Sequence, residues 1–187
     1  MSRRRRIWLT VGGVLLVVVV AGALVFQPWL LFIDDEVVEG EDASEVVGTA
    51  PGGLTDTTVP EASGPARTRV VLASAEFIDA EHGTSGTATI YRRSDGTRFL
   101  RLQDLDTSNG PDLHVWITDR ASGGDCAGCR SSWGTYDDGD QVRLGELKGN
   151  RGNQSYEIPE DADLAGMRSV VIWCDRFNVA FGTADIT

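Results

Sequence analysis

The chain has 187 residues, the length of one ordinary globular domain, and its 17 basic and 28 acidic residues give a net charge of −11. This balance excludes nucleic acid as a partner, because the only basic cluster is Arg3–Arg6 at the N-terminus. An acidic surplus is typical of a solvated surface, while cations or basic proteins stay open as partners.

The first 33 residues have the pattern of a membrane anchor. Arg3–Arg6 precede an uncharged apolar stretch, Ile7–Phe26, and about 20 such residues let a helix cross a bilayer. Because basic flanks stay on the cytoplasmic side, this order predicts a single span with the N-terminus inside and the remainder outside. A cleavable signal peptide is the alternative, with Ala21–Ala23 as its cleavage site. The apolar character continues to Ile33, which favours a retained anchor over 1–33.

Residues 34–68 combine an acidic block with Gly, Pro, Ser and Thr and contain no aromatic side chain. A segment of this composition buries too little apolar surface to offset its conformational entropy. We therefore expect a disordered linker that holds the following domain away from the membrane.

From residue 69 onward, short segments with an alternating pattern are separated by Gly, Asn, Asp and Pro, as is typical of antiparallel strands. A "SDG" hairpin turn is expected at 94–96. About eight strands within 69–187 predict an all-β domain, an antiparallel β-sandwich or a flattened barrel. The strands are expected near 69–79, 86–93, 97–105, 112–118, 141–149, 154–159, 169–173 and 177–181.

The run "VVIWCDRF" at 170–177 contains one thiol within an apolar stretch. Ser169–Trp173 has the pattern of one strand, and Phe177–Phe181 that of the next. Cys174–Arg176 interrupt the alternation, so we expect them to connect the two strands. This places Cys174 at a strand end, near one rim of the domain and outside its middle.

Cys126 and Cys129 form a C-x-x-C pair in a Gly-rich loop. A thioredoxin-type site needs this motif at a helix N-terminus after a strand, and a zinc site needs a second ligand pair. In an oxidising compartment a local Cys126–Cys129 disulfide is the simplest outcome, and it leaves Cys174 free. A bond from one loop cysteine to Cys174 is the alternative.

The chain has two histidines, His82 in a turn and His114 on the polar face of a predicted strand. Each is more simply a surface or hydrogen-bonded group than a metal ligand. With Cys174 and Met167 they supply the ligand types of a blue-copper site, without the tight loop that usually carries them. Haem held by Cys174 or a histidine is a second candidate, although Cys129 starts no haem-attachment motif. The sequence therefore does not decide between copper, haem and no cofactor.

Four sequence motifs follow one another along the domain: "HGTSGTATIY" (82–91), "LRLQDLDTSNGPDLHVWI" (100–117), "LGELKGNRGNQSYEIP" (144–159) and "VVIWCDRFNVAFGTADI" (170–186). From about Ala75 to Ile186 the chain resembles the DM-thirteen domain, an electron-transfer domain often found beside DOMON domains and in anchored bacterial proteins. The resemblance implies a β-sandwich. It also implies a redox role, proposed in that family for the cysteine of the Trp-Cys motif as a bare thiol or prosthetic-group ligand. The matching residue is Cys174, whereas the loop with Cys126 and Cys129 departs from the family pattern.

The sequence thus predicts a single-pass protein of the cell membrane with an extracytoplasmic domain over 69–187. Electron transfer or thiol redox at Cys174 is the leading hypothesis for its function, with His82 or His114 as auxiliary ligands. The alternative is a non-catalytic extracellular binding or adhesion module in which Cys174 is a packed core residue. Either function implies a redox or protein partner at the cell surface. No motif of a hydrolase or nucleotide site occurs in the chain.

Overall fold

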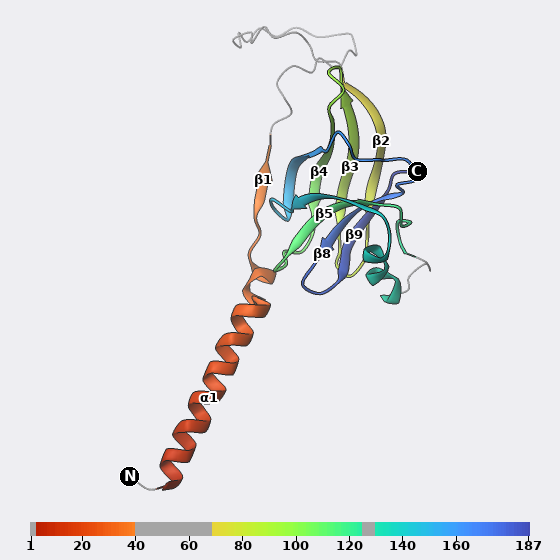
Figure 1. The fold of residues 1–187 in the computed structure, drawn as a ribbon. Coiled ribbons are helices and arrows are strands. Elements are labelled where there is room, and N and C mark those ends of the chain that lie inside the picture. Colours follow the sequence, from red (N-terminus) through yellow and green to blue (C-terminus); the bar gives the residue numbers. More distant parts are fainter. Residues whose placement is uncertain (1–2, 40–68, 125–129) are drawn as a thin grey trace, which may run out of the picture.

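The structure is a computed structural model that describes residues 3–39, 69–124 and 130–187 (Figure 1). Its first element is a long helix, α1 (Arg3–Phe26). Within it, Trp8–Phe26 is long and apolar enough to span a membrane, and none of this stretch is buried. The helix ends where Gln27 adopts a left-handed conformation (φ 42°) and Pro28 follows. A short 3₁₀ helix, η1 (Pro28–Phe32), then begins.

The domain that follows α1 and η1 is built from strands and one further 3₁₀ helix. The helix, η2 (Arg130–Asp138), is an element that periodicity did not predict. The strands are β1 (Glu36–Val38), β2 (Arg69–Asp79), β3 (Ser85–Arg93), β4 (Arg98–Asp106), β5 (Leu113–Thr118), β6 (Gln141–Glu146), β7 (Arg151–Ile158), β8 (Ser169–Cys174) and β9 (Val179–Asp185).

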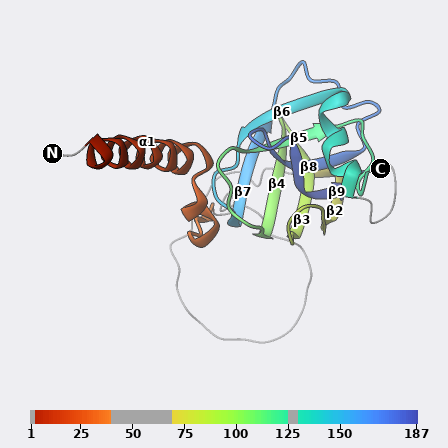
Figure 2. The same ribbon diagram turned by 90° about the horizontal axis from the view of Figure 1, so that it is seen from below.

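The nine strands form one mixed sheet, in the order β1-β7-β4-β3-β2-β9-β8-β5-β6, that is curled into a half-barrel (Figure 2). β2 makes the sheet continuous, because Arg69–Glu76 pair with β3 and Phe77–Asp79 pair with β9. The predicted all-β class is confirmed, but the sandwich of about eight antiparallel strands is not. A sandwich would separate the two halves that β2 joins, and β1 pairs with β7 in parallel.

The curled sheet has a large apolar core on its inner side and a smaller one on its outer side. Successive side chains of a strand point to opposite faces, so β5 contributes Leu113, Val115 and Ile117 to the inner core and Trp116 to the outer one. The outer core also contains Tyr136 of η2, whose hydroxyl donates to the carbonyl of Ala121 (3.0 Å). η2 therefore covers apolar side chains that the sheet alone would expose.

The segment after the helix, residues 28–39, follows the edge of the domain; we call it the post-helix segment. Glu36–Val38 pair with β7 at Arg151–Asn153. Gly152 has a φ of +94°, and a side chain there would collide with the carbonyl of Val37. The first residues of the predicted linker are therefore bound to the sheet as β1, and residues 40–68 lie outside the described residues.

Asn150 holds the post-helix segment to the domain. This side chain is 1% exposed, and its Oδ1 accepts from the Asp35 backbone N–H (2.7 Å). Its Nδ2 donates to Asp34 Oδ1 (2.9 Å) and to the Thr107 carbonyl (2.8 Å). One buried amide thus joins the segment after α1 to the loop that follows β4.

We predict that Asn150→Ala lowers the free energy of unfolding by about 1–3 kcal/mol, because the Thr107 carbonyl and the Asp35 N–H lose their partner. Hydrogen exchange at Glu36–Val38 should accelerate, as measured by mass spectrometry on the full chain. Asn153→Ala is the control, since Asn153 Oδ1 accepts from the Asp104 N–H (2.8 Å) and leaves the contacts of Asn150 intact. Equal exchange at Glu36–Val38 in the two variants would contradict this role.

Candidate functional site

Cys174 is the last residue of β8, and it pairs with Leu113 of β5 and Val179 of β9. The structure thus places it at a strand end, as the sequence predicts. The turn begins one residue later than expected, at Asp175, and the thiol is 0% exposed within the inner core. Its side chain continues the inward-facing row of Val170 and Ile172 and so belongs to the inner core, as the alternative hypothesis of a packed core cysteine expects.

Burial raises the pKa of the Cys174 thiol. Hydrogen bonds from the backbone N–H groups of Phe177 and Arg176 act in the opposite direction, and the carboxylates of Asp112 and Asp175 raise the pKa further. The thiol is therefore protonated at neutral pH. Thiol–disulfide exchange with dissolved thiols needs an accessible thiolate, and this site provides none.

His114 lies on the other face of the sheet from Cys174. It pairs with Trp173, the residue before Cys174, and successive side chains of a strand point in opposite directions. Its Nε2 is 3.0 Å from Asp112 Oδ1 and 3.6 Å from Asp175 Oδ2. His114 is therefore held by the two carboxylates that also influence the thiol.

A cluster of aromatic rings covers the outer face beside Cys174. Trp116 and Trp173 stack with ring centroids 4.8 Å apart, and Tyr136 meets Trp173 edge-on at 6.5 Å. The Arg143 guanidinium lies over the ring of Trp116, 4.4 Å from its centroid. The cluster therefore connects the strand that carries Cys174 to a charged side chain at the surface.

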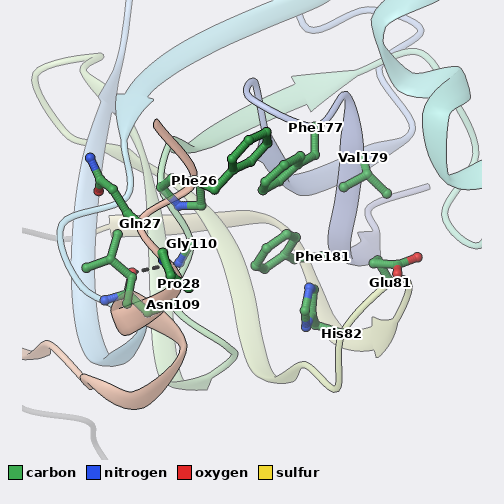
Figure 3. A pocket seen from close by; sticks show the side chains of 12 residues that line it. Phe26, Gln27, Pro28, Glu81, His82, Asn109, Gly110, Phe177, Val179 and Phe181 are labelled. Carbon is green, nitrogen blue, oxygen red and sulfur yellow. Dashed lines mark hydrogen bonds between the residues drawn. The ribbon is translucent and has the colours of Figure 1, made fainter. Parts of the chain in front are cut away.

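An apolar cavity of about 550 Å³ lies between the end of α1 and the domain (Figure 3). Phe26 of the helix stacks on Phe177 of the β8–β9 turn, with ring centroids 6.2 Å apart and planes at 10°. Arg176 fixes the same turn to the helix, because its Nη1 donates to the carbonyl of Val25 (2.9 Å). The lining residues are Phe26, Gln27, Pro28, Leu30, Glu81, His82, Asn109, Gly110, Pro111, Phe177, Val179 and Phe181.

His82 forms part of the cavity wall, where its ring lies against Phe181 (centroids 4.0 Å apart, planes at 40°). Burial lowers the pKa of His82, and the nearby Glu81 carboxylate opposes this shift only in part. The imidazole is therefore neutral at pH 7, with one donor and one acceptor nitrogen.

The predicted ligand residues do not come together. His82 lines the cavity, His114 lies on the outer face, and Cys174 is a free thiol in the inner core. Met167 packs against the inner core at its edge. Across residues 3–39, 69–124 and 130–187, no three His, Cys, Asp or Glu side chains form a group that could hold a metal ion.

This arrangement does not fit the copper set suggested by composition, nor haem held jointly by Cys174 and a histidine, so we derive no step through either group. Cys126 and Cys129 lie outside the described residues, and their disulfide stays a prediction. Sequence reasoning missed the cavity and the aromatic cluster. The Trp residue beside the cysteine was visible in the sequence, but its stacking partner was not assigned.

The fold and these sites define a β-rich domain with a buried thiol, an aromatic cluster and an apolar cavity beside an N-terminal apolar helix. The family model described as Electron transfer DM13 matches residues 76–186, more than half of the chain. The chain belongs to this electron-transfer family, and the match includes Cys174 and all strands from β3 to β9. No curated protein and no solved structure matches the chain.

We predict that Cys174 resists alkylation in the folded protein. In a Cys126→Ser/Cys129→Ser background it is the only cysteine, and iodoacetamide should modify it fully only after unfolding in guanidinium. Because the folded pKa of the Cys174 thiol is raised, its burial contributes fully to stability below the unfolded pKa of about 8.5. That contribution should be lost as pH rises through the folded pKa, as followed by thermal unfolding. Rapid, complete modification of the native protein at pH 7 would contradict the buried site.

We also predict that His82 titrates below its ordinary pKa of 6.5, as measured by nitrogen chemical shifts in NMR. A lowered folded pKa means that the unfolded chain binds more protons than the folded one. The contribution of neutral His82 to stability is therefore complete above pH 6.5 and declines as pH falls through the folded pKa. His82→Phe removes the titrating group and keeps a ring against Phe181. Its melting temperature should fall less than that of the wild type between pH 7 and pH 5. A His82 midpoint at or above 6.5 would contradict the buried environment.

Proposed function

We propose that this protein is a membrane-anchored electron-transfer protein whose domain lies on the extracytoplasmic face of the cell membrane, with its redox function centred on Cys174. The observation that carries the proposal is the electron-transfer family match over 76–186, which contains this cysteine. The structure adds a buried location for the thiol and an aromatic cluster on the adjacent face.

The anchor is supported by the composition and exposure of α1. Trp8–Phe26 presents apolar side chains that the domain leaves uncovered, and a bilayer would cover them. The arginines at its start favour a cytoplasmic N-terminus. The domain would then stand at the outer surface of the membrane, because the post-helix segment binds β7 directly after the helix.

Electron passage fits the surroundings of Cys174 better than thiol exchange does. Cysteine, tryptophan and tyrosine are among the side chains most easily oxidised by one electron, and an electron can reach them without solvent access. Trp173 is the covalent neighbour of Cys174, and its ring contacts Trp116 and Tyr136. We therefore assign to the domain a route between its outer face, where Arg143 covers Trp116, and its inner core.

The alternative function, a non-catalytic binding or adhesion module, is favoured by one observation. Cys174 is 0% exposed and packed among apolar side chains, as an inert core cysteine would be. In that case the function of the domain would reside in its surface, and replacing the thiol would leave binding intact.

Protein-film voltammetry on the full chain in lipid nanodiscs separates these two functions. Below the potentials at which free tryptophan and tyrosine are oxidised, we predict a redox wave for the wild type that Cys174→Ala abolishes while its circular dichroism and melting transition show a folded domain. Cys126→Ser/Cys129→Ser should retain the wave and serves as the matched control for loss of a thiol. Absence of a wave in the wild type, or an unchanged wave in Cys174→Ala, would reject the redox role of Cys174.

A further inference from the structure

We propose that the cavity between α1 and the domain binds the ring of a membrane-soluble quinone, a planar redox-active head group with an apolar tail. This inference rests on the proposed function for its membrane and its electron transfer, and it adds the class of ligand. It concerns binding alone, and it is carried by the size, walls, polar groups and position of the cavity.

The volume of about 550 Å³ lies within the range of about 300–1,000 Å³ that is typical of small-molecule sites. Such sites are mostly apolar, with a few polar groups that orient the ligand. Most of this lining is apolar, and the polar side chains among it are Gln27, Glu81, His82 and Asn109.

The walls offer flat aromatic faces. Phe26 and Phe177 lie nearly parallel on one side of the cavity, and Phe181 and His82 follow them along the wall (Figure 3). Aromatic faces pack well on planar rings, in offset or tilted arrangements. A saturated acyl chain gains only the burial of its apolar surface on such faces, whereas a planar ring also stacks on them, so the geometry favours a planar ring as the ligand.

His82 is the polar group suited to a quinone carbonyl. Within the described part of the chain its ring nitrogens make no hydrogen bond, and its lowered pKa keeps the ring neutral with one N–H donor. Asn109 is already engaged, because its Nδ2 donates to the Ile33 carbonyl and to Asp35 Oδ2, each at 3.1 Å. A carbonyl oxygen on the ligand can therefore accept from His82 without displacing an internal contact.

The position of the cavity explains how an apolar ligand would reach it. Phe26, Pro28 and Leu30 belong to the chain where it leaves the apolar helix, so in a membrane the cavity would lie at the bilayer surface. A ligand dissolved in the bilayer could then enter without crossing water. On the domain side, Val179 lines the cavity and pairs with Cys174, so a bound ring would lie beside the strand pair that contains the thiol.

The test uses the full chain in nanodiscs and decylubiquinone as the probe, with Kd measured by isothermal titration calorimetry. We expect Phe177→Ala and His82→Phe each to weaken binding about tenfold, because they remove one stacking face and one hydrogen bond. Phe177 is a turn residue with 49% exposure, so its removal should leave the fold intact. Leu72→Ala is the matched control, an exposed apolar side chain (43%) on β2 that is absent from the cavity wall, and its Kd should equal that of the wild type.

A photoreactive azidoquinone should crosslink to residues 177–181, as mapped by mass spectrometry. Equal Kd values for the wild type and both cavity variants would overturn the proposal. Equal competition by a fatty acid of the same tail length would also overturn it and assign the cavity to lipid chains. Binding is measured here without electron transfer, so a negative result leaves the voltammetric wave as the separate test of the proposed function.

Discussion

The attachment of the post-helix segment to β7 is the contact on which the arrangement of helix and domain depends. β1 adds backbone pairing to the exposed edge of β7, and Asn150 satisfies three backbone or carboxylate groups from one buried position. Glu39 continues the attachment, since its Oε2 accepts from the Ser155 N–H (2.6 Å). Together with the Arg176–Val25 hydrogen bond and the stacking of Phe26 on Phe177, these contacts place the end of α1 against the domain and form one wall of the cavity.

The second organising feature is the alternation along β8. Consecutive residues send Trp173 to the outer core and Cys174 to the inner core, so one strand joins an aromatic cluster to a buried thiol. β9 then brings Val179 and Phe181 from the same inner face to the cavity. The proposed redox residue and the proposed ligand site are thus linked by two neighbouring strands, β8 and β9, and the short turn between them.

Local patterns predicted most of the strands, because alternation records which side chains face the core. The last strand is an exception: β9 (Val179–Asp185) begins two residues later than the expected 177–181, because Phe177 and Asn178 belong to the turn, where Asn178 has a φ of 51°. The bounds of β2 match the predicted 69–79, and β8 differs only by including Cys174. β1 was not predicted, because Glu36–Val38 has no strand pattern of its own and depends on the edge of β7 and on Asn150. The half-barrel and the cavity were not predicted for the same reason. The half-barrel depends on β2 pairing with both β3 and β9, and the cavity on Phe26 stacking on Phe177, and both contacts join residues far apart in the sequence. Such contacts leave no periodic signal in the sequence.

The contacts of the post-helix segment, Arg176 and Phe177 imply that helix and domain move as one unit, in contrast to a domain on a flexible tether. Pulsed electron paramagnetic resonance on the full chain in nanodiscs tests this directly, with spin labels at Leu24→Cys and Ser94→Cys in a Cys126→Ser/Cys129→Ser background. The fixed arrangement predicts a single narrow distance distribution, because Leu24 lies in α1 and Ser94 in the turn between β3 and β4. A broad distribution, as expected for a domain that moves freely relative to its anchor, would contradict the fixed arrangement of helix and domain and remove the basis for the cavity.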